Sequence, residues 1–416
     1  MNQQEDSTKI DRVKQVLTQL AEKNKDIQEN GNEQTNQNSQ INQNNKPQIQ
    51  NGNQSLNQLK PSLSLNRKKS MDYLIPYIGL DIGGTVAKCC IAFKKGINVE
   101  FTHLAHLKIQ THSDFDLYFE DFPSNDLTEL FEFIDEQEIS NFTQKFYITG
   151  GGAHKYEEVI KKRLGVQVIK VQEMQSLSYG LKVLDMLLPN DSVYRFNQEK
   201  KQIEYIEQSN WMFPLILVQI GSGVSILKVK NKDEFERVSG TSLGGNVFLG
   251  IAHLLTGNNN FNQALKKASI GNNRNIDLFV SDIYKQIQSV PEDIYGDSLC
   301  VSFGRVKQML KEGKEIKTED LLQSALQMVA FNISQIAFLV ARIHKIDHIF
   351  FTGYFIKNHT DTIGCIEEAV NYFSKSQEQN KKAFFLKHDG FLGALGSFYV
   401  AATDSKIKFK SKQEEQ

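Results

Sequence analysis

The sequence predicts an α/β protein with two lobes and a polar tail at its N-terminus. Two glycine-rich hairpins support this prediction, because Tyr77–Phe93 reads as strand, turn and strand, and Leu215–Val229 repeats that pattern about 140 residues later. Helical stretches follow both hairpins. The 416 residues also exceed the size of one usual compact core. We expect an N-terminal lobe at residues 73–212 and a C-terminal lobe at residues 213–404.

The two ends of the chain are expected to lie outside these lobes. Between Gly31 and Lys60, 17 of 30 residues are Asn or Gln, so this stretch has too little apolar surface to offset the entropy lost on ordering. We therefore expect a disordered tail at residues 1–72 and a loose tail at residues 405–416. A weak amphipathic pattern from Ile10 to Leu20 predicts at most a short, solvated helix.

Charge and composition exclude several classes of function. The formal net charge is -1, and the densest basic cluster is the short Arg67-Lys68-Lys69, so we expect no nucleic-acid partner. There is no run of about 18 apolar residues and no signal-peptide pattern, which predicts no membrane span and a cytoplasmic location. The four cysteines lack zinc-type spacing and are expected to be buried free thiols.

The first hairpin has the residues that a polyphosphate site needs. Gly83 and Gly84 permit a sharp turn whose N–H groups can face phosphate, and Thr85 adds a hydroxyl donor. Asp81 is expected to hold hydrated Mg²⁺, because a carboxylate beside triphosphate requires a cation between them. Lys88 is expected to neutralise phosphate charge. A purely structural turn gives a similar string.

Three further glycine segments follow strands or precede helices. These are Thr149–Ala153, the second hairpin's turn Gly221–Gly223, and Gly240–Asn246. A last glycine turn is expected at Thr352-Gly353. Each is compatible with anion binding and also with an ordinary turn. The residues expected to face the nucleotide here are Gly150, Gly151, Gly221, Thr241, Ser242, Gly244, Gly245 and Gly353.

Helices are predicted in both lobes. The clearest runs from Glu319 to about His344, where apolar residues recur at three- and four-residue steps after Thr318 as N-cap. Its apolar stripe is broad, with Phe331, Phe338 and Leu339 off the main face, which fits core packing or a dimer contact. The other predicted helices are Tyr156–Leu164, Val247–Thr256, Ile276–Ile287 and one that Gly390–Gly396 opens.

Several strings together resemble the eukaryotic-type (type II) pantothenate kinases. This family belongs to the superfamily of acetate and sugar kinases, heat-shock chaperone ATPases and actin, so the resemblance implies a two-lobed actin-like fold with duplicated ribonuclease H-like lobes. The resemblance covers roughly residues 76–401. The strings that carry it are Asp81–Lys88, Thr149–Ala153, Ile220–Leu227, Arg237–Gly245, Phe248–Gly250, Leu254–Gly257, Asp282–Tyr284, Ser302–Gly304 and His388–Ala394.

The resemblance also implies a reaction and its residues. It implies ATP-dependent phosphorylation of pantothenate, with Mg²⁺, in a homodimer that CoA or acetyl-CoA inhibits. Glu173 matches the family's general base. Ser222, Ser225 and Arg237 match its contacts to pantothenate or acyl-CoA, and a guanidinium suits the carboxylate of the vitamin.

The chain departs from the family pattern at Gln172, Gln175, Asn246 and Asn272. We expect these departures to affect ligand affinity and regulation, whereas the residue that matches the general base, Glu173, is present. One alternative is a sugar kinase such as an N-acetylhexosamine kinase, but we find no matching aspartate-base motif. The other is a non-catalytic scaffold that senses CoA, which the presence of Glu173 disfavours.

Overall fold

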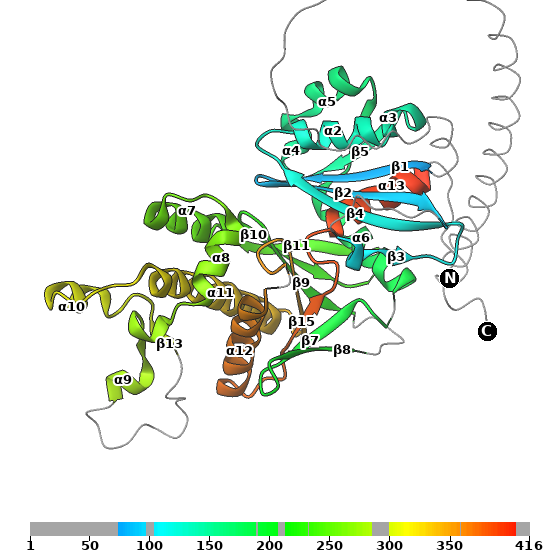
Figure 1. Cartoon of the computed structure of the whole chain (residues 1–416). Coiled ribbons are helices and arrows are strands. Elements are labelled where there is room, and N and C mark those ends of the chain that lie inside the picture. Colours follow the sequence, from blue (N-terminus) through cyan, green and yellow to red (C-terminus); the bar gives the residue numbers. More distant parts are fainter. Residues whose placement is uncertain are drawn as a thin grey trace, which may run out of the picture.

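The computed structural model describes residues 74–96, 104–188, 190–206, 213–231, 233–284, 299–357 and 359–404. The predicted tails, the short helix near Ile10 and the basic cluster at Arg67 lie outside the described residues. The described chain forms two lobes, each built on a mixed β-sheet with helices packed on it (Figure 1).

The first sheet has six strands. Its spatial order is β3 (Ile109–Gln110), β4 (Phe115–Pro123), β2 (Val86–Lys94), β1 (Leu74–Ile82), β5 (Lys145–Thr149) and β6 (Gln167–Lys170). One face is covered by α2 (Thr128–Glu136), α3 (Ile139–Phe142), α4 (Gly152–Lys155) and α5 (Glu157–Leu164). The opposite face packs on α6 (Glu173–Leu187) and α13 (Leu392–Asp404).

The second sheet has seven strands. Its order is β11 (Phe235–Thr241), β10 (Val224–Val229), β9 (Leu215–Ile220), β14 (His348–Thr352), β15 (Lys382–Leu386), β7 (Val193–Asn197) and β8 (Gln202–Tyr205). Its outer face packs on α7 (Gly245–Thr256), α8 (Phe261–Ser269), α11 (Thr318–Ile343) and α12 (Thr360–Ser376). Small elements complete this lobe: η3 (Asn273–Asn275), β12 (Leu278–Phe279), α9 (Val280–Tyr284), β13 (Leu299–Val301) and α10 (Val306–Lys311).

The two sheets share one arrangement. β1 pairs antiparallel with β2 and parallel with β5, and β2 pairs antiparallel with β4. In the same way β9 pairs antiparallel with β10 and parallel with β14, and β10 pairs antiparallel with β11. This duplication confirms the predicted two-lobed α/β fold of the actin-like type.

Helices α6 and α13 lie between the sheets and carry the main core. One buried cluster joins Leu117 of the first sheet, Leu181 and Leu395 of the two helices, and Leu217 of the second sheet. Burying such a side chain contributes about 1.5–3 kcal/mol, so this layer holds the lobes together. The helices approach closely because Gly396 lies against the Ser176 carbonyl, where a β-carbon has no room.

The division at residues 212 and 213 does not coincide with the sheets. Strands β7 and β8 precede residue 212 but pair within the second sheet, through β15. Helix α13 ends at Asp404 but packs on β1 and α6 of the first lobe. The chain therefore crosses between the lobes twice, between α6 and β7 and between β15 and α13.

Most predicted elements are present, with one clear exception. The predicted helix Ile276–Ile287 is wrong at Leu278–Phe279, which form β12, whereas Val280–Tyr284 forms the short helix α9, and the end of the predicted helix lies outside the described residues. The buried Asp277 carboxylate accepts a hydrogen bond from the Phe303 N–H at 2.8 Å, and this tertiary contact replaces helical bonding. Helix α11 begins at Thr318, so Lys317 is its N-cap in place of Thr318.

Burial corrects one further expectation, for the cysteines, and confirms core packing for two residues of α11. Cys89, Cys90 and Cys365 are buried free thiols as predicted, but Cys300 is exposed because β13 is an edge element of a two-stranded sheet. On α11, Phe331 and Phe338 pack on Phe373 of α12, with ring centroids 5.2 and 5.7 Å apart. Phe338 therefore belongs to the core, and the partly buried Phe331 packs against it.

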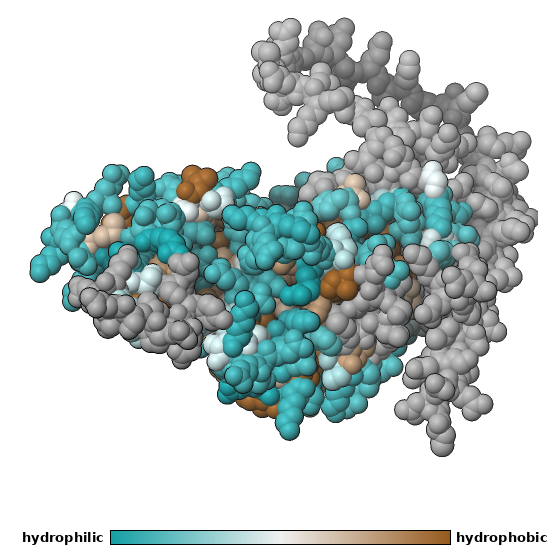
Figure 2. Space-filling view, turned by 90° about the horizontal axis from the view of Figure 1, so that it is seen from below, coloured by the Kyte–Doolittle hydropathy of each residue, from teal (hydrophilic) through white to brown (hydrophobic). Residues whose placement is uncertain are grey.

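Helix α11 is, among the described residues, the one helix long and apolar enough to cross a membrane by length and composition. Its most apolar window is 61% buried inside the fold, as expected for the core helix of a folded lobe. The face in Figure 2 is mostly hydrophilic, with hydrophobic residues only in small separate patches.

Candidate active site

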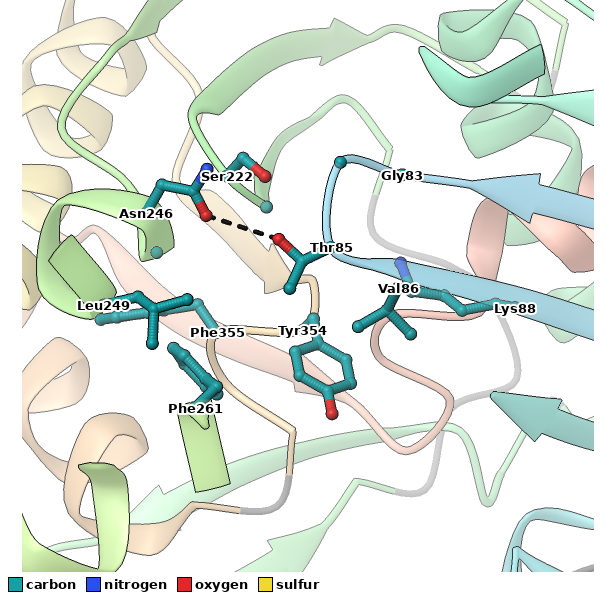
Figure 3. A pocket seen from close by; sticks show the side chains of 13 residues that line it. Gly83, Thr85, Val86, Lys88, Ser222, Asn246, Leu249, Phe261, Tyr354 and Phe355 are labelled. Atoms are coloured by element: carbon teal, nitrogen blue, oxygen red, sulfur yellow. Dashed lines mark hydrogen bonds between the residues drawn. The ribbon is translucent and has the colours of Figure 1, made fainter. Parts of the chain in front are cut away.

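The tips of the two glycine hairpins meet at the mouth of a pocket between the lobes (Figure 3). A β-carbon on Gly84 would lie 3.1 Å from Ser222 Oγ, and Thr85 Oγ1 lies 3.5 Å from Asn246 Oδ1. The residues that line this pocket are Gly83, Gly84, Thr85, Val86, Lys88, Gly221, Ser222, Gly245, Asn246, Leu249, Phe261, Tyr354 and Phe355. The pocket thus has a polar side made by the hairpins and an apolar side made by α7, α8 and the turn after β14.

Backbone hydrogen bonds hold the second hairpin against the start of α7. The N–H groups of Gly245 and Asn246 donate to the carbonyls of Gly221 and Ser222, at 2.9 and 3.1 Å. Gly244 packs so closely that a β-carbon would lie 2.6 Å from the Ser222 carbonyl oxygen. The first N–H groups of α7 are therefore used to fix the hairpin, and Gly245 reaches the pocket without a free N–H.

Asp81 and Lys88 form a buried ion pair beneath the first hairpin. They face each other across the β1–β2 pair, with Nζ 3.6 Å from Oδ2, and are 8% and 7% exposed. Gly150 and Gly393 enclose the carboxylate, since a β-carbon on either would lie 2.6 Å from one of its oxygens. Only glycine fits at both places. The predicted site residue Gly150 is therefore a glycine because it packs against Asp81.

Glu173 occupies the first turn of α6, where the helix dipole favours a carboxylate. Its side chain reaches solvent, yet crowding by protein atoms raises its pKa above the ordinary value. The charge of Asp81 raises this pKa further, while Lys88 and Arg237 lower it. These four residues therefore interact through their charges, and of the four only Lys88 lines the pocket.

Hydroxyl groups fix the position from which Glu173 projects. Thr149 Oγ1 donates to the Val171 carbonyl at 2.9 Å, and Ser176 Oγ lies 3.1 Å from Thr149 Oγ1. Both hydroxyl groups are buried, so each bond is shielded from water. Thr149, at the end of β5, thus anchors the start of α6. In the pairing of β1 with β5, the same Thr149 lies opposite Asp81.

Arg237 and Ser225 lie together on the outer strands of the second sheet. Arg237 Nε lies 3.5 Å from Ser225 Oγ, and the guanidinium is exposed to solvent. Gly240 lies next to the guanidinium, so a side chain there would displace it. An exposed, oriented guanidinium beside a hydroxyl is suited to bind a carboxylate.

The other predicted residues have different surroundings. Thr241 uses its hydroxyl to accept from the Leu243 N–H at 3.1 Å, Ser242 and Gly151 are exposed, and Gly353 packs on the Ile220 carbonyl with φ of +116°. None of these four lines the pocket. The sequence reasoning missed Leu249, Phe261, Tyr354 and Phe355, although Tyr354 directly follows the predicted glycine turn.

The duplicated sheets and the paired glycine hairpins at the cleft define a nucleotide-dependent phosphotransferase of the actin-like class. The Fumble family matches residues 77–400. Pantothenate kinase 1 of Arabidopsis thaliana is 36% identical over 335 residues, which are 78% of this chain and 85% of that protein. Pantothenate kinase of Schizosaccharomyces pombe is 31% identical over 354 residues, covering 83% of this chain and 86% of that protein. The chain belongs to the Fumble family of pantothenate kinases.

Two other proteins are also similar to this chain. The 4′-phosphopantetheine phosphatase of Mus musculus is 33% identical over 340 residues, and the chain spans 40% of that longer protein. Among solved structures, glucokinase from Balamuthia mandrillaris in complex with glucose aligns with a TM-score of 0.41 at 10% identity, over 78% of this chain and 93% of that one.

Proposed function

We propose that this pantothenate kinase transfers the γ-phosphoryl group of ATP to the hydroxyl of pantothenate, with Glu173 as general base. The product is 4′-phosphopantothenate, and the reaction is the first step of coenzyme A synthesis. One observation carries the assignment of the base. The charge of Glu173 interacts with those of Asp81 and Lys88, which are the proposed phosphate residues. It also interacts with the charge of Arg237, a proposed pantothenate residue.

The raised pKa of Glu173 suits this role. A general base works best when its pKa approaches the working pH, because it then accepts a proton and still exists as the anion. Crowding by protein atoms and the charge of Asp81 raise the pKa of Glu173, while the positive charges of Lys88 and Arg237 lower it. The anchored start of α6 supports this proposal, since a base must stay within hydrogen-bond reach of the hydroxyl.

Asp81 is proposed to hold Mg²⁺ together with the nucleotide. Among the described residues no group of three or more His, Cys, Asp or Glu side chains lies ready to bind a metal. The buried Asp81 carboxylate fits a different arrangement, in which one protein carboxylate, phosphate oxygens and water complete the coordination. Bound Mg²⁺ would supply charge neutralisation at the phosphates, while Lys88 and Thr85 orient them.

Arg237, Ser225 and Ser222 are proposed to bind pantothenate. Ser222 lies at the tip of the second hairpin, in the pocket, while Ser225 lies on β10 and Arg237 on the neighbouring β11. This order allows the alcohol end to face the phosphates while the carboxylate end meets the guanidinium. CoA or acetyl-CoA is proposed to compete at the same residues and inhibit the enzyme, as the family resemblance implies.

Two further properties remain proposals. We propose a homodimer, supported by the resemblance and by Leu339 and Ile343 of α11, which are 36% and 73% exposed. Light scattering of the purified protein would measure its mass. We also propose a cytoplasmic location, supported by composition, which fluorescence microscopy of the tagged full chain would test.

The decisive experiment measures ATP-dependent conversion of labelled pantothenate by the purified protein, with and without acetyl-CoA. Formation of 4′-phosphopantothenate that Glu173→Gln abolishes would support the proposal. N-acetylmannosamine and glucose serve as competing acceptors for the sugar-kinase alternative. ATP turnover with a sugar, or none with any acceptor, would reject the proposed function.

A further inference from the structure

An ion pair joins the two lobes beside the pocket. Lys357 Nζ of the second lobe lies 2.5 Å from Asp121 Oδ2, which belongs to β4 of the first lobe. The lysine side chain is 22% exposed and the aspartate side chain is 9% exposed, so water screens this contact only weakly. A largely buried carboxylate that loses its partner is costly, unlike one on an open surface. The ion pair therefore constrains the spacing of the two segments that it joins.

Asp121 is attached to the first glycine hairpin. It lies directly opposite Lys88 in the antiparallel pairing of β2 with β4. Three residues farther on, the Ser124 N–H donates to the Thr85 carbonyl at the tip of the hairpin, at 3.1 Å. Directly opposed residues of neighbouring strands point to the same face of a sheet, so Asp81, Lys88 and Asp121 form one row of alternating charge. The position of Asp121 is therefore tied to the polar side of the pocket.

Lys357 is attached to the apolar side of the pocket. It follows Tyr354 and Phe355, which both line the pocket, in the turn after β14. Its Nζ lies 4.7 Å from the centroid of the Tyr354 ring, and that ring also packs on Phe261, with centroids 5.7 Å apart (Figure 3). A cation over an aromatic ring is attracted by the quadrupole of the ring. One ammonium group therefore holds both Tyr354 and Asp121.

The turn that contains Lys357 is itself fixed to the second sheet. Gly353 has φ of +116°, which glycine adopts readily, and a β-carbon there would lie 2.2 Å from the Ile220 carbonyl oxygen of β9. The Phe355 N–H donates to the same carbonyl at 3.4 Å. Lys357 therefore links a fixed turn of the second lobe to a paired strand of the first.

We propose that Lys357 is a positioning residue for nucleotide binding, which sets the spacing of the two sides of the pocket through Asp121 and orients the Tyr354 ring. The proposal rests on the proposed function, in which the phosphates of ATP lie against the first hairpin. Contact of one nucleotide with both sides of the pocket requires a defined spacing, and a spacing fixed in advance lowers the entropy lost on binding. Lys357 itself does not line the pocket, so it acts through these two partners.

Loss of Lys357 would also change the charge beside the phosphates. Opposed residues of an antiparallel pair have β-carbons about 4.5–5.5 Å apart, and Asp121 is opposed to Lys88 in this way. Without Lys357, the uncompensated carboxylate of Asp121 would offset the charge of Lys88 and repel phosphate. Lys357 thereby keeps the charge of Lys88 available to the nucleotide.

The test is Lys357→Met, which keeps the length and the apolar stem of the side chain and removes its charge. We expect the KM for Mg-ATP to rise about tenfold, the size of one lost hydrogen bond between charged groups. The value of kcat should stay within about twofold, because Glu173 is unchanged. Lys357→Arg keeps the charge and should restore most of the affinity. The rise in Tm caused by Mg²⁺ and a non-hydrolysable ATP analogue should shrink for Lys357→Met in the same way.

Asp121→Asn removes the same ion pair from the other lobe and leaves no uncompensated carboxylate. It should raise the KM for Mg-ATP about threefold, less than Lys357→Met does. The double variant should have a lower KM for Mg-ATP than Lys357→Met, because it removes the uncompensated charge. Asp121→Asn together with Lys357→Arg decides the matter if Lys357→Met does not fold.

Lys381→Met is the matched control. Lys381 Nζ lies 2.7 Å from Asp347 Oδ1, and the lysine side chain is 5% exposed. Asp347 precedes β14, so this ion pair lies at the opposite end of that strand from Tyr354. The control variant should lower Tm and leave the KM for Mg-ATP unchanged.

The proposal is overturned if Lys357→Met leaves the KM for Mg-ATP unchanged, or if the effects of Lys357→Met and Asp121→Asn simply add in the double variant. Failure of the wild type to phosphorylate pantothenate would instead reject the proposed function. In that case the nucleotide-induced rise in Tm still tests Lys357, because it requires no acceptor. A wild type whose Tm the nucleotide analogue does not raise would overturn both proposals.

Discussion

Gly393 of the last helix lies directly against Asp81 of the first strand, so that a β-carbon on Gly393 would be 2.6 Å from Asp81 Oδ2. The two residues are far apart in sequence, and α13 brings them together because it packs between the sheets. The carboxylate therefore has a fixed direction before any ligand arrives. Such preorganisation is what an electrostatic site for phosphate and metal requires.

This contact yields the first prediction. Gly393→Ala should displace the Asp81 carboxylate and raise the KM for Mg-ATP about tenfold or more, because misplacement by about 1 Å is enough to impair a charged site. Gly250→Ala on α7 is the control, since a β-carbon there meets nothing within 4 Å. Initial rates at varied Mg-ATP concentration give the KM of both variants. If Gly393→Ala and Gly250→Ala have equal KM values, the contact between Gly393 and Asp81 does not have this role.

The second prediction concerns the base. Glu173→Gln should lower kcat about 100-fold to 10,000-fold, because it removes the proton acceptor at nearly constant shape. Binding of a fluorescent ATP analogue should stay close to that of the wild type. A variant that loses nucleotide binding instead would show that Glu173 acts on the phosphates.

The third prediction is a dependence on pH. Glu173 must be ionised to accept a proton, and its pKa is raised above 4.5. The rate should therefore fall as the pH drops through that raised pKa. Arg237→Gln removes a positive charge that lowers the pKa, so the acid limb of log kcat should move to higher pH.

A matched variant makes this measurement specific. Ser225→Ala removes the hydroxyl partner of Arg237 without changing any charge, so it should raise the KM for pantothenate and leave the acid limb in place. If Arg237→Gln leaves the acid limb of log kcat at the same pH, the charges of Arg237 and Glu173 are not coupled in the working enzyme.

The fourth prediction concerns Asp389, a 4% exposed residue between β15 and α13 whose pKa is raised by burial. The pKa is about 8 in the folded state against an ordinary value of 3.8, so the folded protein binds more protons between these limits. The stability from this group is complete below pH 3.8 and is lost as the pH rises to about 8, by at most about 1.4 kcal/mol per pH unit.

Asp389→Asn lacks that dependence, so its Tm relative to the wild type should rise between pH 5 and pH 8. Thermal unfolding without ligand, followed by circular dichroism at several pH values, measures the difference. A difference in Tm that is constant across this range would show that Asp389 is ionised in the folded protein throughout.

Local sequence patterns predicted the strands and hairpins well. The bounds of β9 and β10 agree with the apolar runs on either side of Gly221–Gly223, because a buried strand and a glycine turn depend mainly on neighbouring residues. The first residues of the helix predicted at Ile276–Ile287 are not helical, because Asp277 is bonded to Phe303, a contact that no local pattern contains.

The sequence by itself determined the family and the two hairpins and predicted the acidic and basic residues beside them, because turn chemistry and charge are properties of short segments. Only the tertiary structure decided which glycines reach the pocket, that Phe261 and Tyr354 form its apolar side, and that Asp389 is buried. The reason is physical. Distances between segments from opposite ends of the chain depend on how α6 and α13 pack between the two sheets, and that packing is a property of the whole fold.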